Sequence, residues 1–305
     1  MRHHRSLFVL SLPLLLTACG GGAASQAGPT SQASGGATYE VHLTRHPPVG
    51  FTWTERATFA VAQETQVTDA NGAAVSHQFE STELMLGGQY TVLAVGPDGD
   101  ATQLQLALQL FSVNTGQGPT VPSLPPTILI DRRPDGAITG AAGEVIDPAL
   151  VTLLRNIVPD RAPPVDDDLV FGTRERVTVG TGWSIDAVGA ARGLQALQLT
   201  VSPANVSGTT TLVSFDASRG HDALELRSEL QAHHVGMPGL PPGSVEQRAD
   251  MVVAIDALLP TDATLPPIAE VEASQVAVVV TVPSETGPQT VSVAVRQEAQ
   301  HARDF

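Results

Sequence analysis

The chain has little cysteine, no lysine and few aromatic residues. Among its 305 residues there is one cysteine, Cys19, which excludes a disulfide within the chain. The absence of lysine excludes Schiff-base chemistry and the lysine of a phosphate-binding loop. Aromatic residues make up 4% of the chain and hydrophobic residues 42%. We therefore expect a core built from aliphatic side chains, without an aromatic platform for sugars.

Positive charge is also scarce. The chain has 31 acidic and 16 basic residues, which gives a net charge of −15 at pH 7. Loss of Arg2 and Arg5 with an N-terminal signal moves this charge to −17. Nucleic-acid binding needs basic side chains to neutralise phosphates, and anionic lipid head groups attract positive charge. The composition therefore argues against a nucleic-acid partner and against electrostatic binding to an anionic membrane.

The N-terminus has the parts of a secretory signal. Two arginines precede an apolar run over residues 7–16, which Pro13 interrupts. The run is shorter than the roughly 20 apolar residues that a membrane-spanning helix needs. Leu16-Thr17-Ala18 then lead directly into Cys19.

This junction resembles the lipobox of bacterial lipoproteins. The resemblance implies that residues 1–18 are a signal peptide and that Cys19 is acylated, because two or three acyl chains anchor a protein stably. The alternative is an ordinary cleaved signal followed by an unrelated cysteine. With Cys19 lipidated, no thiol remains for a metal site or a cysteine nucleophile.

The residues after the cysteine predict location. Gly20–Gly22 include no Asp in the second position, which in bacterial lipoproteins favours the outer membrane. We expect a protein that faces the periplasm, with the inner membrane and the cell surface left open. Residues 19–38 are small, uncharged and Gly-rich, and are expected to form a flexible lipid-anchored linker.

Alternation with period 2 predicts a mainly β fold (α+β class) from Tyr39 onwards. The clearest case is Gln103–Val113, where Leu104, Leu106, Leu108 and Leu110 are all expected on one sheet face. It forms a hairpin with Gln89–Val95, and a second hairpin spans residues 276–295. Further strands are predicted at Thr52–Val67, Thr127–Asp131, Val170–Val179, Ala196–Val201, Thr209–Phe215, Asp222–Gln231 and Met251–Leu259.

One main helix is predicted near residues 147–158. Asp147 can cap it, Pro148 suits its first turn, and Pro159 ends it. The loop that follows divides the chain into an N-terminal β unit with the helix, residues 39–165, and a C-terminal β unit, residues 166–305. The two units can also form one continuous domain.

The two halves share a short pattern. Val49-Gly50-Phe51-Thr52-Trp53 and Val179-Gly180-Thr181-Gly182-Trp183 both read V-G-x-x-W and hold the only two tryptophans of the chain. The pattern leaves a duplicated β unit and a chance match as alternatives. Trp53 and Trp183 either line a ligand site or, as we favour, pack at the rim of a sheet.

Signals for chemistry are weak. Asp166-Asp167-Asp168 are interpreted as a solvated acidic loop rather than a calcium site, because neighbouring side chains do not readily converge on one ion. His233-His234 lack the spacing of a zinc site. No nucleophile elbow or dinucleotide-binding motif is present. We predict no enzyme activity, no metal and no cofactor.

The pattern of a curved antiparallel meander around one helix resembles the half-barrel of LolA-like periplasmic carriers and lipoproteins. It is also similar to uncharacterised bacterial lipoproteins in which a V-G-x-x-W turn opens a β-meander. These resemblances imply a concave apolar cavity for an acyl chain or another apolar ligand. Its candidate lining is Leu104, Leu106, Leu108, Leu110, Trp53 and Trp183. The alternative is a structural or interaction lipoprotein that binds envelope proteins and has no cavity.

Overall fold

The computed structural model describes residues 36–305 except 134–135, 160–164, 217–219, 237 and 286. The predicted signal peptide, Cys19 and most of the predicted linker lie outside the described residues. Within the described ranges, no helix has the length and apolar composition needed to cross a bilayer.

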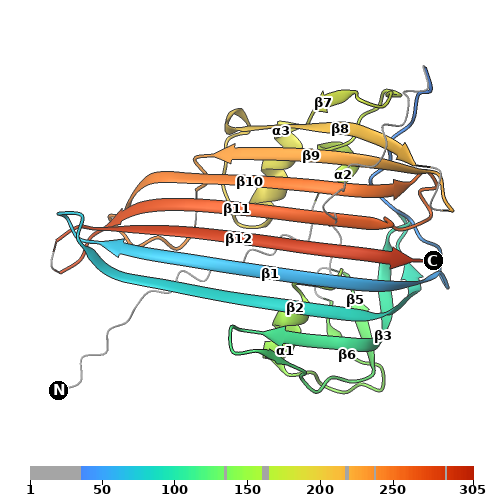
Figure 1. Ribbon diagram of the computed structural model, residues 1–305, viewed down its shortest axis with the longest axis horizontal. Coiled ribbons are helices and arrows are strands. Elements are labelled where there is room, and N and C mark those ends of the chain that lie inside the picture. The colour runs from blue at the N-terminus through green and yellow to red at the C-terminus, as the bar shows by residue number, and fades with distance from the viewer. Residues whose placement is uncertain (1–35, 134–135, 160–164, 217–219, 237, 286) are drawn as a thin grey trace.

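One large antiparallel sheet forms the molecule, as the alternating pattern predicts (Figure 1). The strand order is β6-β5-β3-β2-β1-β12-β11-β10-β9-β8-β7, and β4 pairs with β3. The strands are β1 (Thr52–Thr68), β2 (Ala74–Val95), β3 (Ala101–Asn114), β4 (Pro119–Thr120), β5 (Thr127–Asp131), β6 (Ile138–Gly140), β7 (Gly182–Ser184), β8 (Val206–Asp216), β9 (Ala223–His233), β10 (Val245–Pro260), β11 (Ala269–Val282) and β12 (Gln289–Asp304).

The first and last long strands meet in the middle of the sheet. β1 pairs with β12 from Thr54↔Asp304 to Thr68↔Thr290, so the sheet runs without a break across the boundary expected near residue 165. This pairing brings residues almost 250 positions apart in sequence into direct contact, for instance Glu55 and Arg303.

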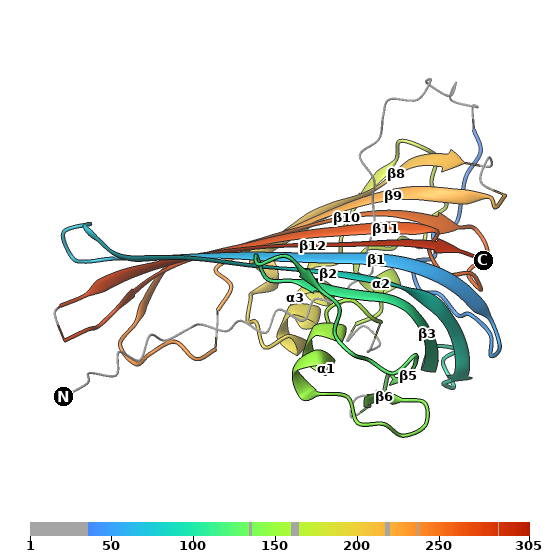
Figure 2. The ribbon, with the colours of Figure 1, turned by 60° about the horizontal axis from the view of Figure 1, so that its bottom comes forward.

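The helices lie on one side of the sheet, where the sheet curves around them (Figure 2). They are α1 (Pro148–Leu154), α2 (Asp167–Val170) and α3 (Ala187–Ala196), and a 3-10 turn, η1, spans Pro203–Asn205. We call the side that carries the helices the concave face. Away from the helices, β1, β2 and β10–β12 continue as a long projecting blade.

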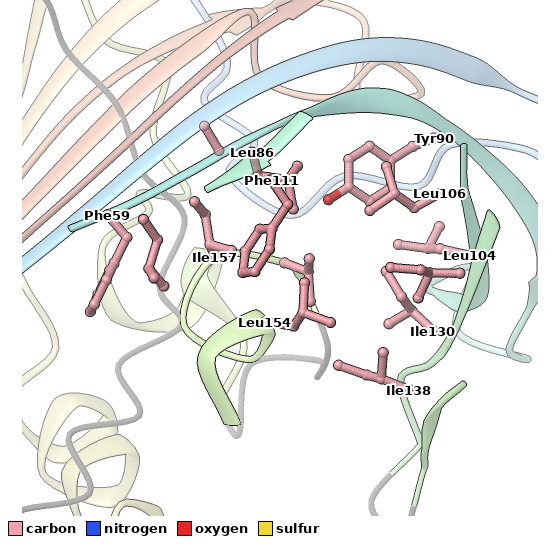
Figure 3. Close-up of a cluster of buried hydrophobic side chains, with 14 of the residues drawn as sticks. Phe59, Leu86, Tyr90, Leu104, Leu106, Phe111, Ile130, Ile138, Leu154 and Ile157 are labelled. Atoms are coloured by element: carbon pink, nitrogen blue, oxygen red, sulfur yellow. The ribbon is translucent and has the colours of Figure 1, made fainter. Parts of the chain in front are cut away.

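The aliphatic core fills the space between sheet and helices. In the N-terminal half, Leu154 and Ile157 from α1 and the turn after it point at Leu86, Tyr90 and Phe111 of the sheet (Figure 3). A second cluster joins α3 to β9–β12, and a third lies under β8–β10. The predicted helix near 147–158 is present but shorter, because it ends at Leu154 and turns follow, and Asp147 accepts a hydrogen bond from the Ala149 N–H. It is not the one main helix expected, since α3 is longer.

Two predicted strands are wrong. Residues 196–201 are the end of α3 and the turn after it, because Asp186 caps a helix whose small residues pack closely against the sheet. Residues 170–179 form turns, with one isolated bridge between Val177 and Tyr39. In both segments, apolar residues that alternate in sequence are buried by loop and helix packing instead of by a strand ladder.

The expectation that four leucines share one face fails at Leu110. The register of β2 against β3 shifts between Gly87 and Gly88, which pair with Leu110 and Leu108 and leave Gln109 as the extra residue of a β-bulge. An extra residue inverts the alternation beyond it. Leu104 and Leu106 are therefore buried on the concave face, whereas Leu110 is exposed on the other.

The V-G-x-x-W segments adopt the same turn. Gly50 and Gly180 both have positive φ, of 85° and 87°. Gly50 N–H donates to the Val92 carbonyl and Gly180 N–H to the Leu212 carbonyl, at 2.8 and 2.7 Å. The strands that follow differ in position, because β1 is central in the sheet and β7 is at its edge.

Candidate functional site

A cavity of about 530 Å³ opens on the concave face between the clusters of aliphatic residues. Its floor comes from the sheet, and its roof comes from residues 43–47, from residues 166–168 at the start of α2 and from the loops at residues 98–100 and 266–267. The apolar lining includes Trp53, Leu104, Leu226, Ile255 and Leu259. The ionisable lining is Arg45, His46, Glu55, Asp98, Asp100, Arg132, Asp166, Asp167, Asp168, Glu270 and Arg303.

A strap formed by residues 39–47 closes one end of this cavity. The N–H groups of Leu43 and Thr44 donate to the two carboxylate oxygens of Asp168, at 2.7 and 3.3 Å. Further along, the His46 N–H donates to the Ala263 carbonyl at 2.9 Å. The strap therefore crosses the ends of several strands and is fixed on both sides, as its path along one end of the sheet shows (Figure 1).

Polar residues form a band across the floor. Every buried polar side chain in the described part of the chain lies on the concave face, where strand alternation would otherwise place aliphatic residues. We call this set the polar band, and it consists of Glu55, Thr210, Ser228, Glu270, Glu272, Ser274, Gln297 and Arg303. On β8 and β9 it lies between the cluster around α3 and the third cluster, and on β12 Gln297 lies between the cluster around α3 and the cluster around α1.

Arg303 holds two buried carboxylates together. Its Nε donates to Glu55 Oε2 at 2.8 Å and its Nη1 donates to Glu270 Oε2 at 2.7 Å. Glu55 is also 2.7 Å from the ring Nδ1 of His301 and accepts a hydrogen bond from the Trp53 ring N–H at 2.8 Å. Burial alone would raise the pKa of Glu55, but the charge of Arg303 and these hydrogen bonds hold it well below its usual range.

Glu272 and Asp167 lack such partners. Glu272 is 3% exposed, and neither of its carboxyl oxygens has a hydrogen-bond partner within the described chain. Burial, and then the charges of Glu270 and Asp167, raise the pKa of Glu272 well above its usual range. Burial and the neighbouring carboxylates raise the pKa of Asp167 to about 7. Among the described residues, Glu272 is the one carboxyl group whose buried oxygens both lack a hydrogen-bond partner.

The predicted site residues are only partly brought together. Trp53 and Leu104 line the cavity, and Trp53 stacks on Tyr90 with ring centroids 5.1 Å apart. Leu106 and Leu108 pack into the cluster around α1. Trp183 lies elsewhere, half-buried, with its ring N–H donating to the Phe171 carbonyl at 2.8 Å.

The acids of the site were missed by the sequence analysis. The Asp166–Asp168 run is more than a solvated loop, because Asp168 fixes the strap and Asp167 lines the cavity. A usable signal was present in the strands, since Glu55, Glu270 and Glu272 fall on the same alternation as the inward apolar residues of β1 and β11. A charged residue at an inward position of a strand indicates a buried polar site.

The donor set does not match a metal centre. Among the residues that the structure describes, no group of three or more His, Cys, Asp or Glu side chains is arranged to hold a metal ion. His233 instead pairs with Asp250 on the surface, at 2.8 Å.

Comparisons with known proteins add little. No family model matches the chain, and no curated protein matches it. A structure of lipovitellin, described by its lipid–protein interactions, aligns over 85% of this chain with 7% identity and a TM-score of 0.34; this chain spans a quarter of that one. DynF from the dynemicin biosynthesis pathway of Micromonospora chersina aligns over 90% of this chain and 92% of its own, with 10% identity and a TM-score of 0.17. Such TM-scores carry no argument about function.

Proposed function

We propose that this protein is a lipid-anchored envelope protein that binds a small ligand with an apolar body in the cavity of the concave face. The cavity itself is the observation that supports binding. Its volume of about 530 Å³ lies within the roughly 300–1,000 Å³ of ligand pockets, and its apolar walls converge with a few fixed polar groups. The ligand differs from the purely apolar one first expected, an acyl chain or another apolar molecule, because 11 of the 26 lining residues are ionisable.

The anchor is a separate part of this proposal and rests on the lipobox resemblance at Leu16–Cys19. Metabolic labelling with a palmitate analogue is expected to mark the wild-type chain and to leave a Cys19→Ser variant unmarked and in the soluble periplasmic fraction. Equal labelling of the two chains would contradict the anchor. The expected outer-membrane location is tested by fractionating the labelled protein.

Filling the cavity tests the binding function. Ala257 lies on the concave face and lines the cavity, opposite Leu226 and Glu270 in the neighbouring strands. An Ala257→Phe variant places a ring in the space and is expected to weaken binding of the fluorescent apolar probe N-phenyl-1-naphthylamine by about tenfold or more. Overpacking of this kind typically costs about 1–3 kcal/mol of stability, so circular dichroism must show a folded protein.

The matched control for this experiment is Ala254→Phe. Ala254 is on the same strand, opposite Glu229 and Ala273, and its side chain is on the face away from the cavity. Probe binding by this variant should equal that of the wild type. Wild-type protein that takes up no probe, or an Ala257→Phe variant that binds as well as the control, would contradict a ligand site in the cavity.

One observation favours the alternative, a protein-interaction lipoprotein. Residues 74–82 of β2 pair with β1 on one side, and the pairing of β2 with β3 begins only at Glu83. Within the described chain this leaves an open sheet edge, which carries exposed Val75 and Phe79. Open edges can pair with an extended partner strand. Crosslinking that finds partners at this edge, together with an empty cavity, would favour the interaction function.

A further inference from the structure

The lining of the cavity is unbalanced in charge. Seven carboxyl groups face it, against three guanidinium groups and one imidazole. A concave site with low-dielectric walls concentrates the field of its charges, so an excess of carboxylates attracts cations. A surplus of carboxyl groups does not by itself make a binding site. A cation is attracted by those carboxylates that no partner within the protein already neutralises.

Most of the cavity's charges are engaged within the protein. Glu55 and Glu270 share Arg303, and Asp168 accepts two backbone N–H groups of the strap. Asp100 lies 3.3 Å from the His46 ring. Arg45 points its Nη1 at the carbonyl oxygens of Pro260 and Asp262, at 2.7 and 3.2 Å.

Asp167 remains unengaged. Its side chain makes no hydrogen bond and no ion pair with the described residues, although both neighbours in the sequence do. Asp167 follows the N-cap of α2, where Asp166 satisfies the Asp168 N–H, so its own carboxyl is left to face the cavity. A carboxylate accepts hydrogen bonds, so the group that would pair with this one is a cation or a hydrogen-bond donor.

Glu272 provides a second, independent indication. It lies two residues beyond Glu270 on β11, so both side chains project from the same face, and it is opposite Ile255, which lines the cavity. Glu272 is not itself one of the lining residues, and both of its oxygens are buried and unpaired. Unpaired buried carboxyls destabilise a fold, and their retention is expected where a ligand supplies the partner. Burial, and then the charges of Glu270 and Asp167, raise the pKa of Glu272, so the three acids interact electrostatically.

We infer that the polar end of the ligand is an organic cation, an ammonium or guanidinium group. It binds beside Asp167, and the apolar body of the ligand lies along Trp53 and Leu104. The inference rests on the proposed function, because it assigns a chemical class to the ligand of the same cavity. Charge-assisted hydrogen bonds to carboxylates supply the selectivity, and the apolar walls supply burial of the body.

Three probes of equal chain length test this assignment: decylammonium, decanol and decanoate. They are titrated at pH 8, where the Asp167 carboxyl is mostly ionised, into the full chain carrying Cys19→Ser and Trp183→Phe. Trp53 is then the one tryptophan, and its fluorescence reports directly on the cavity. Decylammonium is expected to bind about tenfold or more tightly than decanol, and decanoate more weakly than both.

Variants of the acids locate the cation. Asp167→Asn is expected to weaken decylammonium binding about tenfold and to leave decanol binding unchanged. Asp304→Asn removes the same charge from an exposed position away from the cavity and should change neither affinity.

The outcomes separate the two proposals. Equal affinity for all three probes, or decylammonium binding that is indifferent to Asp167→Asn, overturns the cation assignment and leaves a ligand cavity in place. Failure of every probe to bind overturns the proposed function itself. Binding of decylammonium that is selective and lost in Asp167→Asn supports both.

Discussion

Replacing Arg303 with methionine is expected to lower the free energy of unfolding by about 3–5 kcal/mol at pH 7. Arg303 is the shared partner of Glu55 and Glu270, which are 0% and 3% exposed. Methionine has a similar reach and no charge, so two buried carboxylates lose their cation at once. Removing one partner of a buried ion pair is costly because the remaining charge is neither solvated nor paired.

The loss should depend on pH. In the wild type, the pKa of Glu55 is lower in the folded protein than its usual value of about 4.3. Its ionised form therefore stabilises the fold above that value, and the contribution is lost as the pH falls towards the folded pKa. The difference between Arg303→Met and wild type should accordingly be largest at neutral pH and shrink below about pH 4. Urea unfolding followed by circular dichroism at several pH values measures it.

The control is a second arginine of β12. Arg296 is exposed, and its position in the strand alternation places it on the face away from the polar band. Arg296→Met is expected to change stability by no more than about 0.5 kcal/mol. A double variant, Arg303→Met with Glu55→Gln, should recover part of the loss, since it removes one orphaned charge. Equal stabilities of the Arg303 and Arg296 variants would show that the ion pairs contribute nothing.

Replacing Glu272 with methionine is expected to act in the opposite direction and raise the free energy of unfolding by about 1–3 kcal/mol at pH 8. Its two oxygens are buried without partners, and its neighbours across the strands, Ile255 and Ala299, are apolar. Methionine fills a similar volume and removes the group that must be desolvated. An apolar residue at such a position is often more stable than a buried charge.

Glu272 also contributes to the pH dependence of stability. The charged groups that act on Glu272 are Glu270 on its own strand and Asp167 on α2. Arg303 on β12 and Arg45 on the strap act on Glu270. The pKa of Glu272 in the folded protein is raised, so at intermediate pH the folded protein binds a proton that the unfolded chain has lost. Stability therefore falls as pH rises above the usual value of about 4.3, up to the folded pKa.

Asp167 contributes with the same sign up to its pKa of about 7. Glu55 has the opposite effect on stability, because its lowered pKa makes the fold less stable as the pH falls. Wild-type stability should therefore be greatest under mildly acidic conditions, where Glu55 is ionised and Glu272 and Asp167 still hold protons. Glu272→Met should flatten the alkaline decline. Thermal unfolding between pH 4 and 9 checks this, with Glu298→Met as control because Glu298 is exposed on the opposite face of β12. A decline that is the same in both variants would contradict the assignment.

The Glu272→Met variant also bears on the ligand site. If Glu272 is retained to bind a cation, the variant gains stability and loses affinity for decylammonium at the same time. Such a combination is expected where a binding group is kept at the expense of stability. A gain in stability with unchanged affinity would leave Asp167 as the acid that binds the cation.

Much of the fold could be predicted from the sequence, because strand alternation and turn residues are local signals. Thr127–Asp131 is predicted to the residue, and both hairpins lie where alternating leucines and valines place them. Leu110 shows the limit of this inference. One extra residue at the bulge beside Gly87 inverts the face, and the pattern of leucines does not reveal it.

The candidate site was less accessible to sequence reasoning. Trp53 and Leu104 were selected as apolar lining and do line the cavity, whereas Asp166–Asp168 were interpreted as a solvated loop and Glu55 and Glu270 were not selected. Glu272 is chemically the same as Glu298, and its place in the alternation is the one local clue to its burial. Asp167 has no such clue, since its environment depends on the packing of α2 against the sheet.

The sequence by itself determined an acidic, lysine-free chain that folds as a long-stranded antiparallel sheet with an aliphatic inner face. Only the tertiary structure decided where the charges on that face meet. Pairing of β1 with β12 places Glu55 beside Arg303, and the strap and α2 bring Asp168 and Asp167 over the same floor. These neighbours are separated by more than a hundred residues, so no local pattern encodes their contact. Burial in a shared low-dielectric space then gives otherwise ordinary carboxyl groups different affinities for protons and ligands.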